Sequence, residues 1–374
     1  MKTAIVTGVT GFIGSRVACK LLKCGWSVHA LGRGKAGYSF SKRVISAIDN
    51  ICGFPLKREI FENLHCHEVD ICKDDLGLQN QNAAQQFGTN AILFHIAGDT
   101  RFKPPSPEAQ FKINVTGSLN VIQTLRNSLA SVVHVSTAYV AGRRQGIVME
   151  DELDEGQELR NNYEKTKLKA EIEVTKLCRE LGIPLSITRP SIIINDSVTG
   201  RSPTLTHFNA LVDVITRIQL HFKNNKNEIA RKEIRIPVTP NAYPNLAPVN
   251  PVVDALIEIG TNTRAHGKTF HLCHPAPQPN SEIMNILVKA FHVKDRIRLS
   301  FVDEIPQKLS WTEEMMLRSL KQYLPYLNEY CTFDVTNTKS IIPDYDSWLP
   351  SLTYDYMEKV IFFQRHRQFK RSHG

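Results

Sequence analysis

The chain has 374 residues, of which 42% are hydrophobic and 22% charged, the balance of an ordinary globular protein. It contains no apolar run of the roughly 20 residues that a membrane-spanning helix needs, and the opening MKTAIVTG lacks the features of a secretory signal, so we expect a cytoplasmic protein. A formal net charge of +9 suits an anionic partner such as a phosphate-rich cofactor, coenzyme A or an acidic carrier protein.

Apolar segments typical of buried strands alternate with segments of helical spacing through the first half of the chain. The predicted strands cover 2–8, 26–31, 65–71, 90–98, 131–140 and 183–190, and the predicted helices cover 12–24, 39–52, 109–126 and 161–181. This alternation predicts an α/β fold, a Rossmann-type doubly wound parallel sheet with helices on both faces.

The alternation loosens after residue 190. Segment 223–247 is rich in Lys, Asn and Pro and predicts an exposed insertion, and the final hundred residues are mostly helical. Residues 248–275 contain a helix and a strand that we expect to return to the main body. We therefore expect a nucleotide-binding Rossmann domain over 1–200, joined by 248–275, and a smaller, mostly helical C-terminal substrate-binding lobe over 201–374.

A glycine-rich stretch, TGVTGFIG, lies between the first predicted strand and the first predicted helix. Glycines at this spacing let the backbone approach a pyrophosphate, which then faces the helix N-terminus. The strand–helix context predicts a dinucleotide site rather than a purely structural turn. The residues expected to contact the dinucleotide here are Gly8, Thr10, Gly11, Phe12, Ile13 and Gly14.

The residues after the second strand bear on the choice of dinucleotide. NAD sites usually carry an acid there, but this chain has no Asp or Glu before Asp49. It has Arg33 at the strand end, with Lys35, Lys42 and Arg43 beyond. Because a guanidinium matches a 2′-phosphate, we expect NADP(H) rather than NAD(H), the alternative being a solvated basic loop.

A further contact is expected at the third strand, which ends at Asp70 and Ile71. The Asp70 carboxylate could accept a hydrogen bond from the adenine amino group, or it could cap the following turn. We expect both residues to lie at the cofactor.

Tyr163 and Lys167 lie one turn apart on the helix predicted at 161–181, so they share a face. We expect the ammonium to lower the pKa of the phenol, which could then exchange a proton with a carbonyl or alkoxide. Ser136 and Thr137 follow another buried strand and supply hydroxyl donors for a developing oxyanion. Strand carboxyl ends are where open α/β sheets bind ligands.

The motifs TGVTGFIG, HIAGDT, NVTGSLN, STAYV and YEKTK, in that order and spacing, resemble the extended short-chain dehydrogenase/reductase superfamily over about residues 1–200. The resemblance implies that Tyr163 is the general acid/base and that Lys167 holds the nicotinamide ribose. It implies that Thr137, rather than Ser136, is the hydroxyl beside the reacting oxygen. It also places Ala97, Gly98, Pro190 and Ser191 along the cofactor and gives Asn114 a role in stabilising the neighbouring strand.

HIAGDTRF, STAYVAG followed by Glu150 or Glu152, NNYEKTKLKAE and RPSIIINDSVTG resemble the branch containing fatty acyl-CoA reductases and thioester reductase domains, the male-sterility-type NAD(P)-binding domains. Asn195 and Asn250 depart from that pattern, where Gly and Asp are expected. The resemblance implies NADPH-dependent reduction of an acyl thioester, carried by coenzyme A or a carrier protein, to an aldehyde or alcohol.

Two other functions remain alternatives. One is an NAD(P)-dependent epimerase or hydroxysteroid-type dehydrogenase of the same superfamily, acting on a sugar nucleotide or secondary alcohol. A dehydratase is disfavoured because Ala138 and Tyr139, not acids, follow Thr137. The other is a non-catalytic NADPH-sensing or scaffold protein on this fold, which is disfavoured because Tyr163 and Lys167 are both present.

Three remaining features carry weaker expectations. Segment 205–222 predicts an apolar helix that could line an acyl tunnel or pack as core or lid. The tail with Lys359, Arg365, Arg367, Lys370 and Arg371 could dock on an acidic carrier or a membrane surface, or be a solvated terminus. Superfamily members are often dimers, so a homodimer is a possible assembly of this chain. We expect no nucleic-acid partner, no metal site and eight reduced thiols.

Overall fold

A computed structural model describes residues 1–52, 56–78, 86–202, 208–209, 212–213, 215–217, 219, 232–291 and 297–372, although not the side chains of 232, 297 and 366–372. Its centre is a seven-stranded sheet in the order β11-β7-β5-β4-β1-β2-β3, and every neighbouring pair is parallel. The strands are β1 (Thr3–Thr7), β2 (Ser27–Gly32), β3 (Leu64–Glu68), β4 (Ala91–His95), β5 (Leu129–Val135), β7 (Leu185–Pro190) and β11 (Thr269–Leu272).

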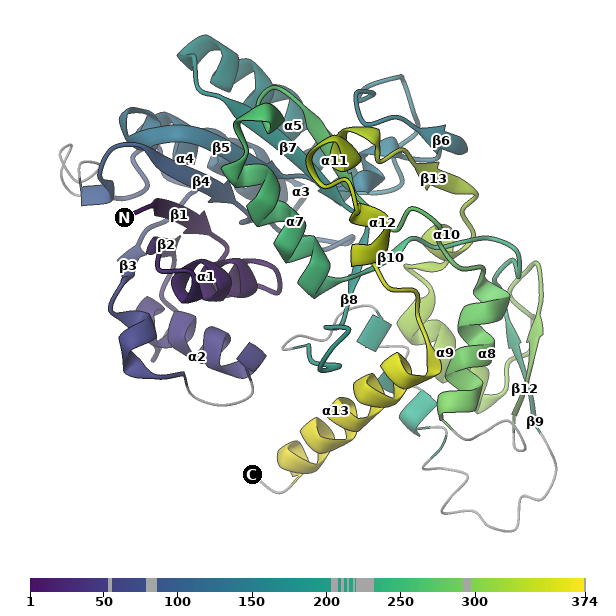
Figure 1. Ribbon diagram of the computed structural model, residues 1–374. Helices are drawn as coiled ribbons and strands as arrows, with labels where there is room; N and C mark the ends of the chain where they lie inside the picture. Colours follow the sequence, from purple (N-terminus) through teal and green to yellow (C-terminus); the bar gives the residue numbers. More distant parts are fainter. Residues whose placement is uncertain are drawn as a thin grey trace.

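Helices cover both faces of this sheet (Figure 1). On one face α1 (Gly14–Lys23), α2 (Phe40–Cys52) and α7 (Val249–Thr261) bury a shared apolar core against the strands. On the other face α4 (Gly117–Leu125) and α5 (Asn162–Leu181) enclose a second core. The prediction of a Rossmann-type doubly wound α/β fold is confirmed, and most strands and helices predicted in the first 200 residues lie within a few residues of the observed ones. The strand predicted at 131–140 is wrong in its second half, because β5 ends at Val135 and Ala138–Ala141 form a 3-10 helix.

The strand order places the ligand crevice. The chain runs outward from β1 through β2 to β3 and then returns to β4 on the other side of β1. The loops that follow β1 and β4 therefore diverge, which opens a crevice at the carboxyl ends of these two strands. A Cβ atom on Gly8 would lie 2.9 Å from the backbone nitrogen of Ala97, so only glycine lets the two loops approach this closely.

A third apolar core lies beside the sheet and belongs to the C-terminal half. It is built by β9 (Lys232–Ile236), β12 (Ile297–Phe301), α8 (Asn280–Ala290), α9 (Trp311–Leu320) and α13 (Tyr354–Ser372). Shorter elements connect the cores: β6 (Gly146–Val148), β8 (Ile192–Ile194), β10 (Leu246–Pro248), α10 (Leu324–Leu327), β13 (Cys331–Phe333), α11 (Thr336–Ile341) and α12 (Tyr345–Trp348). The division at residue 200 stays a prediction, while β11 forms an edge strand of the main sheet.

One expectation is wrong in its second half. Segment 223–247 was predicted as an exposed insertion, and its residues 223–231 lie outside the described part. The remainder contains β9, which pairs in parallel with β12, and Ile234 and Ile236 are each only 1% exposed. The alternation in EIRIP that marks this strand is short and lies beside a polar stretch, which hid it.

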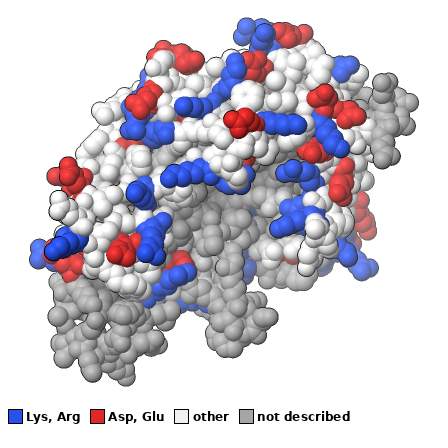
Figure 2. Space-filling view, turned by 180° about the vertical axis from the view of Figure 1, so that it is seen from behind, with Lys and Arg blue, Asp and Glu red and all other residues white. Residues whose placement is uncertain are grey.

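Charge is mixed on the surface. Figure 2 shows Lys and Arg interspersed with Asp and Glu on the face seen from behind. Within the described ranges no helix has both the length and the hydrophobicity to cross a bilayer.

Candidate active site

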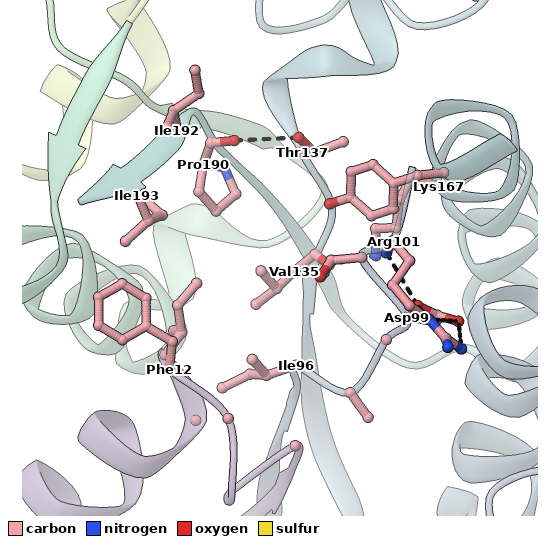
Figure 3. Close-up of a pocket in the computed structure, with 18 of the residues that line it drawn as sticks. Phe12, Ile96, Asp99, Arg101, Val135, Thr137, Lys167, Pro190, Ile192 and Ile193 are labelled. Carbon is pink, nitrogen blue, oxygen red and sulfur yellow. Dashed lines mark hydrogen bonds and ion pairs between the residues drawn. The ribbon is translucent and has the colours of Figure 1, made fainter. Parts of the chain in front are cut away.

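A cavity of about 800 Å³ extends from the glycine loop, across the carboxyl ends of the central strands, to the C-terminal lobe. Figure 3 shows Phe12 from the glycine loop, Ile96 from the end of β4, and Thr137 and Lys167 arranged around this open space. Of the predicted site residues, the cavity is lined by Gly8, Thr10, Gly11, Phe12, Ile13, Gly14, Arg33, Arg43, Ile71, Ala97, Gly98, Thr137, Tyr163, Lys167, Pro190 and Ser191. Lys35 and Asp70 are absent from this lining.

The glycine loop forms a cradle with no room for side chains. Gly8 has φ +71°, and a Cβ atom on Gly14 would overlap the Gly8 carbonyl. The Gly11 N–H donates to the Gly8 carbonyl oxygen at 2.9 Å, which closes the turn just before α1. The amino end of α1 therefore faces the cavity with bare backbone, a surface that fits the pyrophosphate of a dinucleotide.

Two arginines line the cavity beyond β2. The Arg43 guanidinium donates to the Arg33 carbonyl, which holds both residues at this end. The Lys35 backbone instead pairs with Tyr38, away from the cavity. The Glu68 carboxylate accepts from the Gly34 N–H at 3.1 Å. Sequence reasoning missed this contact because Glu68 lies at the end of the neighbouring strand β3, far from Gly34 in the sequence.

Asp70 and Ile71, which were both expected at the cofactor, have different positions relative to the cavity. The Asp70 carboxylate accepts from the Cys72 N–H at 3.0 Å, which is the turn-capping alternative, whereas Ile71 and Cys72 line the cavity. An adenine contact by Asp70 stays a prediction.

The three predicted catalytic side chains meet at the centre of the cavity. Asn161 caps α5 by accepting from the Glu164 N–H at 3.0 Å, which fixes Tyr163 in the first turn and Lys167 one turn later. The Lys167 ammonium donates to the Val135 carbonyl at 2.7 Å, at the end of β5. Thr137 follows β5, and its hydroxyl donates to the Pro190 carbonyl at 3.5 Å, in the same cavity as Tyr163.

Burial controls the protonation of this group. It raises the pKa of Tyr163 to about 12, partly opposed by the nearby Thr137 hydroxyl and assisted by the charge of Glu164. It lowers the pKa of Lys167 to about 8, with Glu171 acting in the opposite direction. We expected Lys167 to lower the pKa of the phenol, but the net direction is upward because desolvation dominates. Tyr163 therefore carries its proton at neutral pH.

Asn114 connects the loop after β4 to the catalytic helix. Its amide oxygen accepts from the Asp99 N–H at 2.7 Å, and its amide nitrogen donates to the Asp99 carbonyl at 3.0 Å and to the Thr166 hydroxyl at 2.9 Å. These bonds place the 98–101 loop against α5, so Asn114 stabilises the neighbourhood of the strand.

Sequence reasoning missed several lining residues. Arg101 forks onto the Asp99 carboxylate at 2.6 and 2.9 Å, and its guanidinium is largely exposed at the cavity. Phe102 stacks on Tyr326 with ring centroids 5.1 Å apart, and Tyr326 lies edge-on to Tyr139. Phe102 lies in the segment DTRF and Tyr326 in the segment YLPYL, and nothing in either segment alone indicates that the two residues are in contact.

The far half of the cavity is apolar and aromatic. Its lining includes Phe102, Ile192, Ile193, Phe208, Leu246, Ile283, Met284, Leu320, Tyr323, Tyr326 and Leu327. Phe208 belongs to the predicted helix 205–222, of which the other described residues are 209, 212–213, 215–217 and 219. In the tail, Arg365 donates to the Gln219 side chain at 2.6 Å, and the side chains of Arg367, Lys370 and Arg371 lie outside the described part.

The protein is similar in sequence to a protein family and to curated proteins. It matches the family described as "Male sterility protein" over residues 6–256, more than half of the chain. It is 25% identical over 375 residues to Nonribosomal peptide synthetase asaC of Aspergillus flavus, covering 91% of this chain and 34% of that protein. It is 25% identical over 303 residues to human Fatty acyl-CoA reductase 2, covering 71% of this chain and 55% of that protein. The chain thus spans about a third to a half of these relatives.

Solved structures share the fold. The terminal R domain from the myxalamid PKS-NRPS pathway superposes with a TM-score of 0.78 at 20% identity, over 99% of this chain and 92% of that one. An archaeal thiolation-reductase di-domain gives 0.77 at 16% identity, over 98% and 76%. The fold is that of the extended short-chain dehydrogenases/reductases, and the chain belongs to the Male sterility protein family.

Proposed function

We propose that this chain is an NADPH-dependent oxidoreductase that reduces an acyl thioester to an aldehyde or alcohol. The observation that carries the proposal is the position of Thr137, Tyr163 and Lys167. They lie in one cavity, between a backbone cradle that fits a dinucleotide and an apolar half that suits an acyl chain. The two curated relatives, one named a fatty acyl-CoA reductase and one a nonribosomal peptide synthetase, support a thioester over a sugar nucleotide.

The residues present fit a nicotinamide dinucleotide. The cradle from Gly8 to Gly14 would hold the pyrophosphate, and Arg33 and Arg43 would hold a 2′-phosphate, which supports NADPH over NADH. Lys167 would hold the nicotinamide ribose. The dinucleotide, when bound, supplies the hydride that reduces the carbonyl carbon.

The protein's own contribution is to hold the carbonyl oxygen and deliver a proton. The Thr137 and Tyr163 hydroxyls would donate to the oxygen as negative charge develops, and removing one such donor from a dry site costs about 3 kcal/mol of transition-state stabilisation. With a pKa raised to about 12, Tyr163 has a proton to give at neutral pH. The resulting hemithioacetal loses its thiol and leaves an aldehyde, and a second round of reduction would give an alcohol.

The carrier is proposed to be coenzyme A or an acidic carrier protein. The net charge of +9 and the exposed Arg101 guanidinium at the cavity favour an anionic carrier. A cytoplasmic location, a homodimer and contact of the basic tail with a membrane surface stay predictions.

The test measures NADPH oxidation with a long-chain acyl-CoA, comparing wild type with Tyr163→Phe. Tyr139→Phe is the matched control, because Tyr139 lines the same cavity and its buried hydroxyl has no hydrogen-bond partner among the described residues. We expect turnover to collapse only in Tyr163→Phe, with NADPH binding retained in all three proteins.

Equal turnover by Tyr163→Phe would overturn the assignment of the acid. Tight NADPH binding without turnover of acyl-CoA would direct the assay to carrier-protein thioesters. Failure with both carriers, together with oxidation or epimerisation of a nucleotide sugar or secondary alcohol, would overturn the thioester proposal in favour of the alternative activity.

A further inference from the structure

Two cysteines meet where helices α1 and α2 pack against each other. The Sγ atoms of Cys19, in α1, and Cys52, the last residue of α2, are 3.7 Å apart although the residues are 33 positions apart in the sequence. Cys19 is 4% exposed, whereas Cys52 is half-buried. Two thiols in contact across a helix pair are a candidate for covalent chemistry that buried, isolated thiols lack.

The surroundings give the two sulfurs different roles. Lys23, one turn beyond Cys19 on α1, directs its ammonium to the Cys52 sulfur at 3.7 Å. An electropositive, partly exposed position is the environment of reactive cysteines. Burial raises the pKa of Cys19 to about 12, so Cys19 stays a protonated thiol until a partner sulfur is activated beside it.

We propose that Cys19 and Cys52 form a redox-active pair that a peroxide converts into a disulfide between α1 and α2. The Cys52 thiolate attacks one oxygen of the peroxide, the O–O bond breaks, and Cys52 becomes a sulfenic acid as hydroxide leaves. The hydroxide takes up the proton that the Cys52 thiol released and becomes the first water. The Cys19 sulfur then attacks the Cys52 sulfur, the S–O bond breaks, and the Cys19 proton leaves with the hydroxyl as the second water. Two thiols and one hydrogen peroxide give one disulfide and two waters.

The geometry suits this reaction. The sulfurs must approach from 3.7 Å to a bond length of about 2.05 Å, a movement that χ rotations at the end of a helix can supply. Cys52 is the last residue of α2. Neither cysteine lines the nucleotide cavity, so the modification leaves the proposed active site open and is separate from the proposed catalysis.

The cross-link has a predicted physical consequence. It would close a long loop that contains β2 and most of α2, which removes conformational freedom from the unfolded chain. The oxidised protein is therefore expected to unfold at a higher temperature than the reduced protein. Reduction by a thiol reagent is expected to reverse the shift.

The experiment treats the whole protein with hydrogen peroxide, alkylates the remaining thiols, and maps peptides by mass spectrometry. We expect the loss of two of the eight titratable thiols, a mass lower by two hydrogen atoms, and a peptide pair linked through Cys19 and Cys52. Cys52→Ser should abolish the link. Cys24→Ser, which removes an exposed thiol directly after α1, is the matched control and should leave the link intact.

Lys23→Gln gives a second, independent reading, because Lys23 is exposed and its removal should not disturb folding. We expect this variant to form the same cross-link more slowly than wild type. The proposal is overturned if Cys52 is driven to sulfinic acid while Cys19 stays alkylatable, or if the link forms through Cys24. A rate unchanged in Lys23→Gln overturns the role of the ammonium.

Discussion

Tyr326 of α10 donates its phenolic hydroxyl at 2.5 Å to Glu164, the residue that follows Tyr163 in the catalytic helix. Glu164 is fully buried and also accepts from the Arg160 N–H at 2.7 Å. Because Tyr326 lines the apolar half of the cavity, this bond ties the C-terminal lobe to the helix that carries the proposed acid. Arg160 extends the connection by pairing with Glu329.

Breaking this connection should cost stability and substrate binding together. Glu164→Ala removes the buried carboxylate that accepts from the Arg160 backbone N–H and from the Tyr326 hydroxyl. We therefore expect a loss of about 3 kcal/mol in the free energy of unfolding, measured by urea titration. Tyr326→Phe should cost about 1 kcal/mol and raise KM for the acyl substrate. Tyr330→Phe, which alters a more exposed phenol of the same lobe, should change neither quantity.

The lowered pKa of Lys167 predicts an alkaline limit to activity. As pH rises through about 8, Lys167 loses its charge while Tyr163, with a pKa near 12, keeps its proton. We expect kcat/KM for NADPH to fall with an apparent pKa of about 8. Lys167→Arg, which stays charged, should remove this limb even if its activity is lower. A wild-type profile flat to pH 10 would contradict the assignment.

Lys167 has the opposite effect on stability: activity is expected to fall as the pH rises, whereas its contribution to the free energy of unfolding is expected to increase. Its pKa in the folded protein lies below the usual value of 10.5, so between about pH 8 and 10.5 the unfolded chain binds more protons. The Lys167 contribution to stability therefore rises with pH in this window. Comparing the urea midpoints of wild type and Lys167→Met across that range isolates it, and a difference that does not change with pH would refute it.

Glu150 predicts a stability effect of the other sign. Burial raises its pKa to about 7, although it accepts from the His271 N–H at 2.8 Å and from the Thr338 hydroxyl at 2.8 Å. The folded protein therefore binds this proton more tightly than the unfolded chain. We expect the Glu150 contribution to fall between about pH 4.5 and 7 and Glu150→Gln to flatten that slope, as followed by thermal unfolding.

Cofactor preference is predicted to depend on two arginines and not on their neighbour. Arg33→Ala or Arg43→Ala should weaken NADPH binding by about tenfold to a hundredfold and leave NADH binding nearly unchanged, because each removes a charge-assisted contact to phosphate. Lys35→Ala is the matched control, since Lys35 carries the same charge and is absent from the cavity lining. An equal loss of NADPH affinity in all three variants would contradict specific contacts by Arg33 and Arg43, and would indicate that only the overall positive charge matters.

Local signals were sufficient for the elements that sequence reasoning placed correctly. The glycine loop, the buried strands and the pair Tyr163 and Lys167 are each written in a few consecutive residues, and the parallel sheet follows from their alternation. The missed features depend on segments far apart in the chain. Glu164 meets Tyr326 across 162 positions, and Glu68 meets Gly34 across neighbouring strands.

The direction of the Tyr163 pKa shift was missed for a related reason. The spacing of Tyr163 and Lys167 shows a charge one turn away, which lowers a phenol's pKa. The depth of burial, which raises it, depends on packing against distant segments such as Phe102, whose ring centroid lies 6.1 Å from that of Tyr163, and that packing is not local to the motif.

The most direct test of thioester reduction is to trace the transferred hydrogen. The protein would be incubated with a long-chain acyl-CoA and NADPH deuterated at the transferred position, and the product analysed by mass spectrometry. We predict deuterium on the former carbonyl carbon, one atom in an aldehyde and two in an alcohol, and no labelled product with Tyr163→Phe. Consumption of the labelled nucleotide without deuterium at that carbon would contradict the account.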